Sequence, residues 1–217
     1  LDQDLGKVAI IGGGVIGSFL AYRLSKEGVP VVVIERRGVA SEASGWSAGN
    51  VQPATRTYGQ FQIDMGAASL SEFRRWMPEI KADSGADLRD QEVRYLYAAM
   101  DDDEVHDTRV FTKELAEANL RVEWIDAKTA KELDSRLSPD LLGGMLHSDC
   151  MQMDPYLFTN ALVTAAGHNG TSLINEEAIG LEFIHDKVTG VKLSGGDVLH
   201  CDTVVVAMGA WSGQAIQ

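Results

Sequence analysis

The chain has 217 residues, of which 45% are hydrophobic and 24% charged, a balance typical of a folded globular protein that excludes a disordered one. Its net charge of −13 and its lack of basic clusters argue against nucleic acid and anionic membranes as partners. No apolar run approaches about 18 residues, and the charged start LDQDLGKV is not typical of a signal peptide. We therefore expect no transmembrane segment and a cytoplasmic location.

The first predicted element is a buried parallel strand at Val8–Ile11, which leads directly into a glycine-rich turn. The turn fits the pattern G-x-G-x-x-G, in which Gly12 permits a sharp turn and Gly14 leaves room for a pyrophosphate beside the backbone. Gly17 lets the following helix pack closely on the sheet. This spacing predicts a dinucleotide-binding turn rather than a merely structural one.

A helix is predicted after the turn, with Ile16, Leu20 and Leu24 on one face and Gly28 at its end. Its free N–H groups and positive dipole end attract an anion, so the acidity of the whole chain is no objection. A second strand, Val31–Ile34, follows, and Glu35 lies where a carboxylate accepts hydrogen bonds from ribose hydroxyls. The predicted cofactor contacts in this region are Gly12, Gly14, Val15, Ile16, Gly17 and Glu35.

Two arginines follow the ribose carboxylate. A carboxylate at position 35 would repel the additional phosphate of NADP, which favours a dinucleotide without it. Arg36 and Arg37 are either solvated loop charges or phosphate contacts, and the sequence leaves both interpretations open.

The next stretch, VASEASGWSAGNVQP, is rich in serine, alanine and glycine and shows neither a helical nor a strand period. At these residues the chain resembles the family of FAD-dependent amine and amino-acid oxidoreductases that includes D-amino-acid oxidase, glycine oxidase, sarcosine oxidase and D-amino-acid dehydrogenase. In that family an A-S-G-x-S-A-G-like segment runs along the pyrophosphate towards the isoalloxazine ring. The matching segment begins at Ala43, and the resemblance implies FAD as cofactor and contacts at Ser44, Gly45, Ser47, Ala48, Gly49 and Asn50, with Ser47, Ala48 and Gly49 nearest the ring.

The far end of the chain, DTVVVAMGAWSG, is similar to a late V-V-x-A-x-G-A-W-S signature of the same family. It predicts a buried strand at Val204–Ala207 that returns to the nucleotide-binding sheet, and a glycine turn beside the cofactor. A β-hairpin is predicted between Val188–Leu193 and Val198–Cys201, around two glycines. The resemblance implies cofactor contacts at Ala207, Gly209 and Trp211. It also places Ile179 beside the adenine, although a plain core isoleucine is an alternative there.

The middle of the chain lacks a βαβ rhythm and is expected to form an inserted α+β substrate domain. A helix that ends at Gly85 is predicted in this region. The residues expected on its buried face are Met65, Ala68, Phe73, Trp76, Met77 and Ile80. A strand is predicted at Val93–Met100, followed by an acidic solvated loop at Asp101–Glu104. A helix at Thr112–Leu120 and a strand at Val122–Ile125 are expected next. A short helix at Ala127–Leu133 should follow, with Asp126 as its N-cap. A last helix is expected from near Pro155 to near Gly167.

The expected fold class is therefore α/β: a Rossmann-like FAD-binding domain with a parallel sheet and a hairpin, and an inserted substrate domain. The segments 1–53 and 150–217 form the FAD-binding domain, and 54–149 form part of the substrate domain. Family members continue beyond the last signature, so the resemblance implies a fragment, a processed chain or one piece of a larger enzyme. An oligomer or a partner chain supplying the remaining part is left open.

The resemblance implies oxidative deamination of a small amine or amino acid: a hydride passes from the α-carbon to flavin N5, and the resulting imine is hydrolysed to an oxo acid. Two alternatives stay open, an NAD-dependent Rossmann dehydrogenase and a non-catalytic FAD-binding fragment or subunit. Cys150 and Cys201 are predicted to be reduced core thiols, and no metal site is expected. We predict no catalytic residue, because each histidine lies outside any motif and is expected to be a surface or hydrogen-bonded residue: His106, His147, His168, His185 and His200.

Overall fold

The computed structural model describes residues 6–55 and 59–216, and the chain divides into two compact units. Unit 1 comprises Leu1–Ala48, Pro78–Leu88 and Asp154–Gln217, and unit 2 comprises Gly49–Met77 and Arg89–Met153. Unit 2 overlaps most of the insert expected at 54–149. The largest difference is the segment 78–88, which packs within unit 1.

Unit 1 is built on a four-stranded parallel sheet in the order β11-β1-β2-β7. Strands β1 (Val8–Ile11) and β2 (Val31–Ile34) are buried at every residue and have the predicted bounds. β7 (Ser172–Ile174) and β11 (Thr203–Val206) flank them. β11 begins and ends one residue earlier than the predicted strand, and the prediction that it is buried is wrong, because none of its residues is buried. The Rossmann-like α/β fold class is thereby confirmed.

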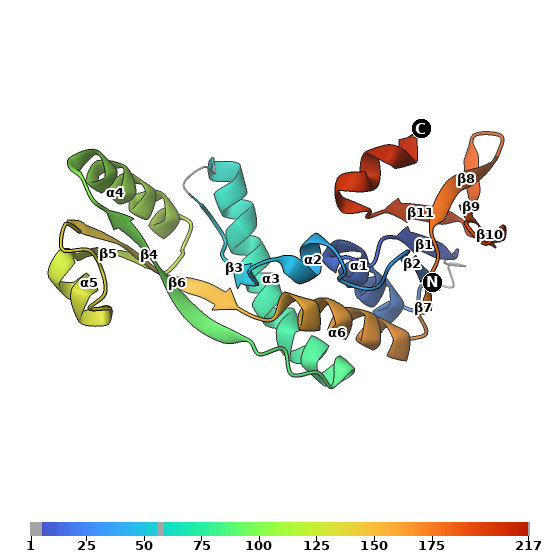
Figure 1. The fold of residues 1–217 in the computed structure, drawn as a ribbon, viewed down its shortest axis with the longest axis horizontal. Coiled ribbons are helices and arrows are strands. Elements are labelled where there is room, and N and C mark those ends of the chain that lie inside the picture. The colour runs from blue at the N-terminus through green and yellow to red at the C-terminus, as the bar shows by residue number, and fades with distance from the viewer. Residues whose placement is uncertain (1–5, 56–58, 217) are drawn as a thin grey trace. The chain divides into compact units, whose positions relative to one another are not determined.

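Two helices accompany this sheet, α1 (Val15–Lys26) and α6 (Pro155–His168), and they pack against each other (Figure 1). The buried residues of α1 are mostly small, namely Gly17, Ser18, Ala21, Tyr22 and Ser25. The apolar residue Ile16, in contrast, is 65% exposed. The apolar face predicted for α1 is therefore not its buried face, because small side chains are what allow close approach to the neighbouring elements.

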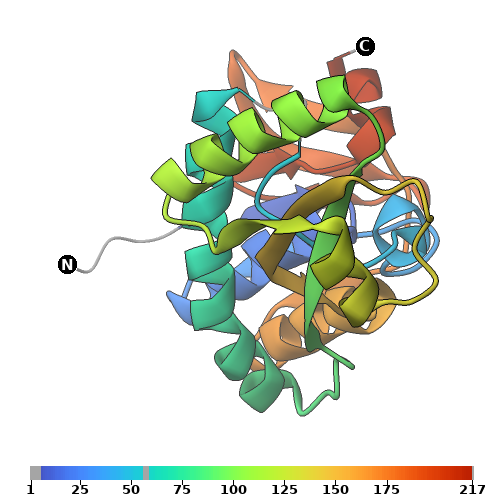
Figure 2. The same cartoon turned by 90° about the vertical axis from the view of Figure 1, so that its left-hand side faces the viewer.

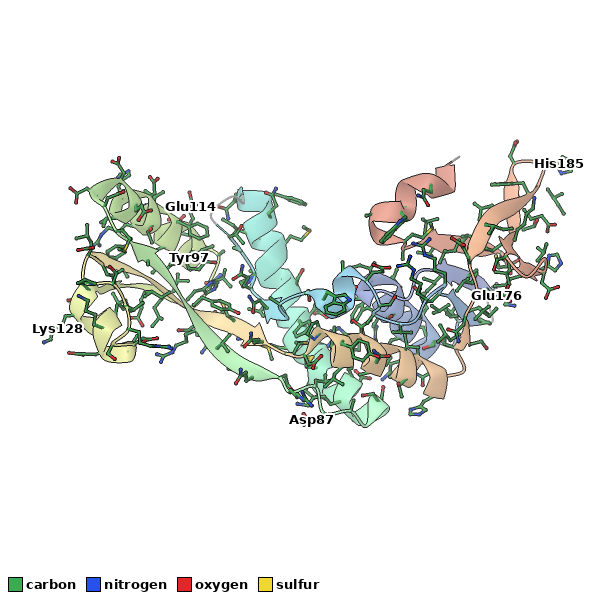
Figure 3. The ribbon with its side chains drawn as sticks, viewed as in Figure 1. Asp87, Tyr97, Glu114, Lys128, Glu176 and His185 are labelled. Atoms are coloured by element: carbon green, nitrogen blue, oxygen red, sulfur yellow. The ribbon has the colours of Figure 1, made fainter. Side chains whose placement is uncertain are left out.

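A three-stranded antiparallel sheet completes unit 1, with β8 (Ala178–Ile184), β9 (Lys187–Leu193) and β10 (Val198–His200). The predicted hairpin between β9 and β10 is confirmed, and Gly196 supplies its positive φ of 96°. His185 lies at the tip of the other hairpin, between β8 and β9 (Figure 3). A buried cluster joins this sheet to the parallel sheet through Ala9, Ile11, Ile34, Val191, Leu193 and Cys201.

Unit 2 centres on the long strand β6 (Gly143–Gln152), which the sequence analysis missed. β6 pairs antiparallel with β3 (Asn50–Val51), β4 (Gln91–Ala99) and β5 (Val122–Asp126). Almost all of its residues are buried, because Met145 packs into one apolar cluster and Leu146 into another. Burial of both faces removes the alternating pattern by which an antiparallel strand is recognised.

Helix α4 (Asp102–Glu117) lies against β4, β5 and β6, as Figure 2 shows. It corrects two predictions, because the acidic run is not a loop and the helix begins before Thr112. Asp101 is the N-cap and accepts a hydrogen bond from the Glu104 backbone at 2.8 Å, and the acidic first turn complements the helix dipole. The short helix α5 (Ala127–Leu133) has the predicted bounds and its predicted cap.

Helix α3 (Gln60–Ser84) contributes residues to both units and ends before Gly85, whose φ is +68°. Its buried residues are Ile63, Leu70, Met77 and Ile80. The predicted core face is therefore only partly correct, since Met65 is 53% exposed. Among the residues that the structure describes, no helix is both long and apolar enough to cross a membrane.

The last turns of α3 are held in unit 1 by a polar cluster with α1. The Tyr22 hydroxyl donates to Asp83 at 2.8 Å, and Lys26 forms ion pairs with Asp83 and Glu79. Burial and the hydrogen bond to Asp83 raise the pKa of Tyr22 to about 12, so it stays a neutral donor. These contacts explain why the segment from Pro78 belongs to unit 1.

Candidate cofactor-binding site

The glycines of the turn between β1 and α1 differ in what a side chain at each position would meet. Gly12 has φ +115°, and a Cβ there would lie 2.4 Å from the carbonyl oxygen of Ala207. Gly14 is the N-cap of α1 and makes no side-chain cap hydrogen bond. A Cβ on Gly14 would meet only the Ser44 hydroxyl, at 3.0 Å. Near Gly14 the head of α1 is therefore bordered by a side-chain hydroxyl and not by backbone, and it carries the positive end of a helix dipole, which favours an anion.

Gly17 is the tightest position of the turn. A Cβ there would lie 2.1 Å from the carbonyl oxygen of Gly12, so Gly17→Ala must displace the backbone of the turn. We expect a loss of about 2 kcal/mol in the free energy of unfolding, in place of the gain that alanine usually brings inside a helix. Chemical denaturation followed by circular dichroism measures it. Gly167→Ala in α6, where a Cβ meets no atom within 4 Å, is the matched control, and an equal response of both variants would contradict the assigned crowding.

Ser44 reaches the head of α1 from the short helix α2 (Ala43–Trp46). Its hydroxyl accepts a hydrogen bond from the Val15 backbone N–H at 2.9 Å. Gly45 is required by the backbone, because a Cβ there would lie 2.0 Å from the carbonyl oxygen of Ala40. The structure thus brings Ser44 to Gly14 and Val15, whereas Gly45 packs against its own loop.

The Glu35 carboxylate is oriented by main-chain donors at the end of β2. It accepts hydrogen bonds from the Gly13 N–H at 2.8 Å and from the Arg37 N–H at 2.9 Å. A Cβ on Gly13 would lie 3.0 Å from this side chain, so the carboxylate lies directly against the glycine turn. This position suits a carboxylate that accepts from sugar hydroxyls while a phosphate lies at the helix.

The two arginines form ion pairs. Arg37 pairs with Glu42 at 2.6 Å, and Arg36 pairs with Glu177 at 3.1 Å. The Arg36 guanidinium also lies over the ring of Trp211, 5.0 Å from its centroid. Arg36 and Trp211, predicted from opposite ends of the sequence, are therefore neighbours.

An open cavity of about 380 Å³ lies beyond the carboxyl ends of β2 and β7 (Figure 3 labels Glu176 of its wall). Ligands of parallel α/β sheets bind at this edge. The sequence analysis missed four of its lining residues, although one of them, Ser194, directly follows the predicted strand Val188–Leu193. The lining consists of Arg36, Arg37, Asn175, Glu176, Glu177 and Ser194.

The other residues predicted to contact the cofactor are distributed over both units. Ser47 and Ala48 belong to unit 1, while Gly49, with φ +71°, and Asn50 of β3 belong to unit 2. Ala207 meets the glycine turn, and Gly209 begins the 3-10 helix η1 (Gly209–Ile216) that carries Trp211. Ile179 is 63% exposed on β8, which contradicts the alternative that it is a core residue.

The environment of the buried histidine contradicts its prediction, whereas that of the two cysteines agrees with theirs. His147 is fully buried, and neither ring nitrogen has a hydrogen-bond partner among the described residues, so it is not the surface or satisfied residue that we predicted. Burial lowers its pKa and keeps the imidazole neutral. Cys150 and Cys201 are both free and buried, and burial raises the pKa of Cys150 to about 12. Within residues 6–55 and 59–216 no group of three or more acidic, histidine or cysteine side chains could hold a metal.

Comparison with known proteins identifies the family. A family model described as FAD dependent oxidoreductase matches residues 7–217. The chain belongs to this family. FAD is the cofactor of these oxidoreductases, and the dipole-facing turn at Gly14 and the oriented Glu35 carboxylate fit an adenine dinucleotide.

Two curated relatives and one solved structure illustrate the likeness. Glycine oxidase of Bacillus subtilis (strain 168) is 26% identical over 212 residues, covering 95% of this chain and 55% of the relative. One subunit of the anaerobic glycerol-3-phosphate dehydrogenase of Escherichia coli (strain K12) is 27% identical over 216 residues, covering 97% of this chain and 38% of the relative. The crystal structure of glycine oxidase from Bacillus cereus gives a TM-score of 0.87 at 26% identity, covering 96% of this chain and 58% of that one. The chain thus spans about half the length of these glycine oxidases, and a smaller share of the dehydrogenase polypeptide.

Proposed function

We propose that this chain forms the FAD-binding part of an enzyme that oxidises a small amine or amino acid. The observation that carries the proposal is the head of α1, where the Glu35 carboxylate accepts from the Gly13 N–H and a Cβ on Gly14 would meet the Ser44 hydroxyl but no backbone atom. Membership of the FAD-dependent oxidoreductase family and the likeness to glycine oxidases support it. We further propose that 1–53 and 150–217 serve the cofactor and that 54–149 face the substrate.

Different residues of the chain would bind different parts of the dinucleotide. The amides at the head of α1, with the hydroxyl of Ser44, would hold the diphosphate, and Glu35 would accept from the adenosine ribose. The cavity beside Arg36 and Glu177 has the volume and the polar wall that suit the remainder of the adenosine. Because these two side chains neutralise each other, this end of the site carries little net charge for the neutral adenine ring.

Bound FAD would supply the acceptor for a hydride from the substrate α-carbon, giving an imine that water hydrolyses to an oxo acid and free amine. The protein then needs only to orient the α-carbon hydrogen and to exclude competing water. The structure agrees with a reaction in which the cofactor accepts the hydride and the protein only orients the substrate. Its buried histidine and cysteines lie in the cores of the units and not at the glycine turn. Two free buried thiols also suit the reducing cytoplasm that we propose as the location.

Titration of the purified chain with FAD tests the cofactor, and we expect a protein-bound flavin absorption spectrum. Anaerobic addition of glycine or sarcosine to the loaded chain should bleach the flavin band. Bleaching by glycerol 3-phosphate and by no amine would contradict the amine donor. Tight binding of NAD without FAD would contradict the cofactor assignment, and bound FAD that no donor reduces would indicate a binding fragment or subunit.

A further inference from the structure

The imidazole of His147 lies buried in the middle of the sheet of unit 2. The strand β6 pairs His147 with Tyr95 of β4 on one side and with Val122 of β5 on the other, and the residue is 0% exposed. Neither ring nitrogen has a hydrogen-bond partner among the described residues, and the Tyr95 hydroxyl has none either. A neutral imidazole leaves one donor and one acceptor unsatisfied there, whereas a protonated ring would leave two donors and a charge. The folded unit 2 therefore favours the neutral ring.

The one carboxylate of β6, that of Asp149, is already engaged. Its Oδ1 accepts from Arg74 at 2.9 Å and from Arg121 at 2.8 Å, and its Oδ2 accepts from the Arg121 backbone N–H. Arg74 also pairs with Glu92 at 3.2 Å, so two arginines and two acids balance in charge. Asp149 by itself raises the pKa of His147, but burial of the ring outweighs it, and the pKa is lowered.

The other elements that pack on this sheet bring no unpaired carboxylate to His147 within the described residues. Tyr95 and Cys150 stay neutral, because burial raises the pKa of both. The charged residues next to the two paired positions, Arg94 on β4 and Glu123 on β5, are exposed. Apart from Arg74, the helices α3 and α4 turn neutral side chains toward this core, among them Ile63, Leu70, Thr108, Phe111 and Leu115.

We propose that His147 is a proton switch of unit 2, in which the uptake of one proton by the ring loosens the core between β4, β5 and β6 in mild acid. Unit 1 keeps its stability under the same conditions, because each of its described histidines is exposed and takes up a proton without unfolding: His168, His185 and His200. The switch requires no bound cofactor, so it goes beyond the proposed function and is tested without it.

The direction of the pH dependence follows from where the proton binds more tightly. Burial lowers the pKa of His147 in the folded chain below its usual 6.5, so the unfolded chain holds this proton more tightly. The stability that depends on the neutral ring is complete above pH 6.5 and is lost as the pH falls below it, towards the pKa of the folded state. In this window unfolding takes up one proton, so the unfolding equilibrium constant rises up to about tenfold for each pH unit. Asp149 loses its contribution only below pH 3.8, outside a measurement in mild acid.

Native-state hydrogen exchange of the whole chain, read by mass spectrometry and corrected for intrinsic exchange, tests the switch at about pH 7.5 and about pH 5. In the wild type we expect the opening constant of β6 peptides to rise about tenfold or more in acid, while peptides of β1 and β2 keep theirs. His147→Gln removes the titrating ring, so its β6 peptides should open equally at both pH values. His106→Gln, at an exposed position of α4 in the same unit, is the matched control and should keep the wild-type response.

A second variant and a direct titration keep the test decisive where glutamine disturbs the core. His147→Phe has a ring of similar size without nitrogens, and its β6 peptides should likewise be insensitive to pH. NMR of the wild-type rings should show His147 neutral over this range while the exposed histidines titrate. A wild-type response in either His147 variant, or an equal rise in the peptides of β1 and β2, would overturn the proposal. So would a His147 ring that titrates together with the exposed histidines in the folded chain, a result that needs no variant.

Discussion

The substitution Gly14→Val is expected to abolish FAD binding while the fold survives. A Cβ at this position would lie 3.0 Å from the Ser44 hydroxyl, a tight contact from which the Ser44 side chain must move a few tenths of an ångström, and it would meet no backbone atom within 4 Å. The same side chain would fill the space through which a diphosphate approaches the amides of α1. We expect the dissociation constant to rise at least about 100-fold, which corresponds to about 2.7 kcal/mol. Titration monitored by flavin fluorescence and absorption measures the loss.

The other glycines make this result specific. Gly167→Ala, remote from the turn and free of close contacts, should bind FAD as the wild type does. Gly17→Ala should lose stability first, because its Cβ would meet the Gly12 carbonyl oxygen at 2.1 Å. Unchanged FAD affinity in Gly14→Val would mean that no phosphate approaches there, and the proposed cradle would have to be abandoned. Unfolding of that variant would instead mean that Ser44 cannot move away from the valine side chain.

The substitution Asp149→Asn is expected to give the second large effect, on the stability of unit 2. Asp149 is 4% exposed. It accepts from the side chains of Arg74 at 2.9 Å and Arg121 at 2.8 Å and from the Arg121 N–H, and so joins α3, β6 and the start of β5. Removing its charge leaves two guanidinium groups without their partner, and their partial exposure moderates the cost. We expect a loss of about 2 to 3 kcal/mol in urea denaturation.

The contribution of Asp149 depends on pH in a definite direction. Burial by itself raises the pKa of the carboxyl, but the hydrogen bonds from Arg121 and Arg74 outweigh it and lower the pKa from 3.8 to about 2. The folded state therefore holds this proton less tightly than the unfolded state does. The stabilisation, about 2 kcal/mol, is complete above pH 3.8 and is lost as the pH falls towards 2.

Asp134→Asn is the control for this experiment. Asp134 also pairs with an arginine, Arg136 at 2.6 Å, but both side chains reach solvent. Its removal should leave the free energy of unfolding of unit 2 nearly unchanged, because exposed ion pairs contribute little. Equal losses for the two variants would show that burial of the Asp149 cluster is not what stabilises the sheet.

The elements predicted correctly are those whose signals are local. Val8–Ile11 and Val31–Ile34 are short apolar runs rich in β-branched residues, the first followed by Gly12 and the second by Glu35, and Ala127–Leu133 begins at an aspartate cap. β6 was missed because its burial depends on two clusters contributed by distant helices. The start of α4 was an avoidable error, since an aspartate followed by acidic residues is a standard helix start.

The same distinction holds for the candidate site. The spacing of the glycines and Glu35 predicted local geometry, and the structure has a Gly14 bordered by no backbone atom and an oriented carboxylate there. The stacking of Arg36 on Trp211 joins residues that are far apart in the sequence, and no local pattern indicates it.

The hydroxyl of Ser44, held by the first amide of α1, bears on how a nucleotide enters. Because that amide already has an acceptor, the turn incurs no desolvation penalty at this point and keeps its shape before loading. The Ser44 hydroxyl can still donate its proton in a hydrogen bond to an incoming phosphate oxygen. Binding of the nucleotide therefore replaces one set of hydrogen bonds with another and requires no refolding. Association should accordingly be a single concentration-dependent phase in stopped flow, without a slow isomerisation after it.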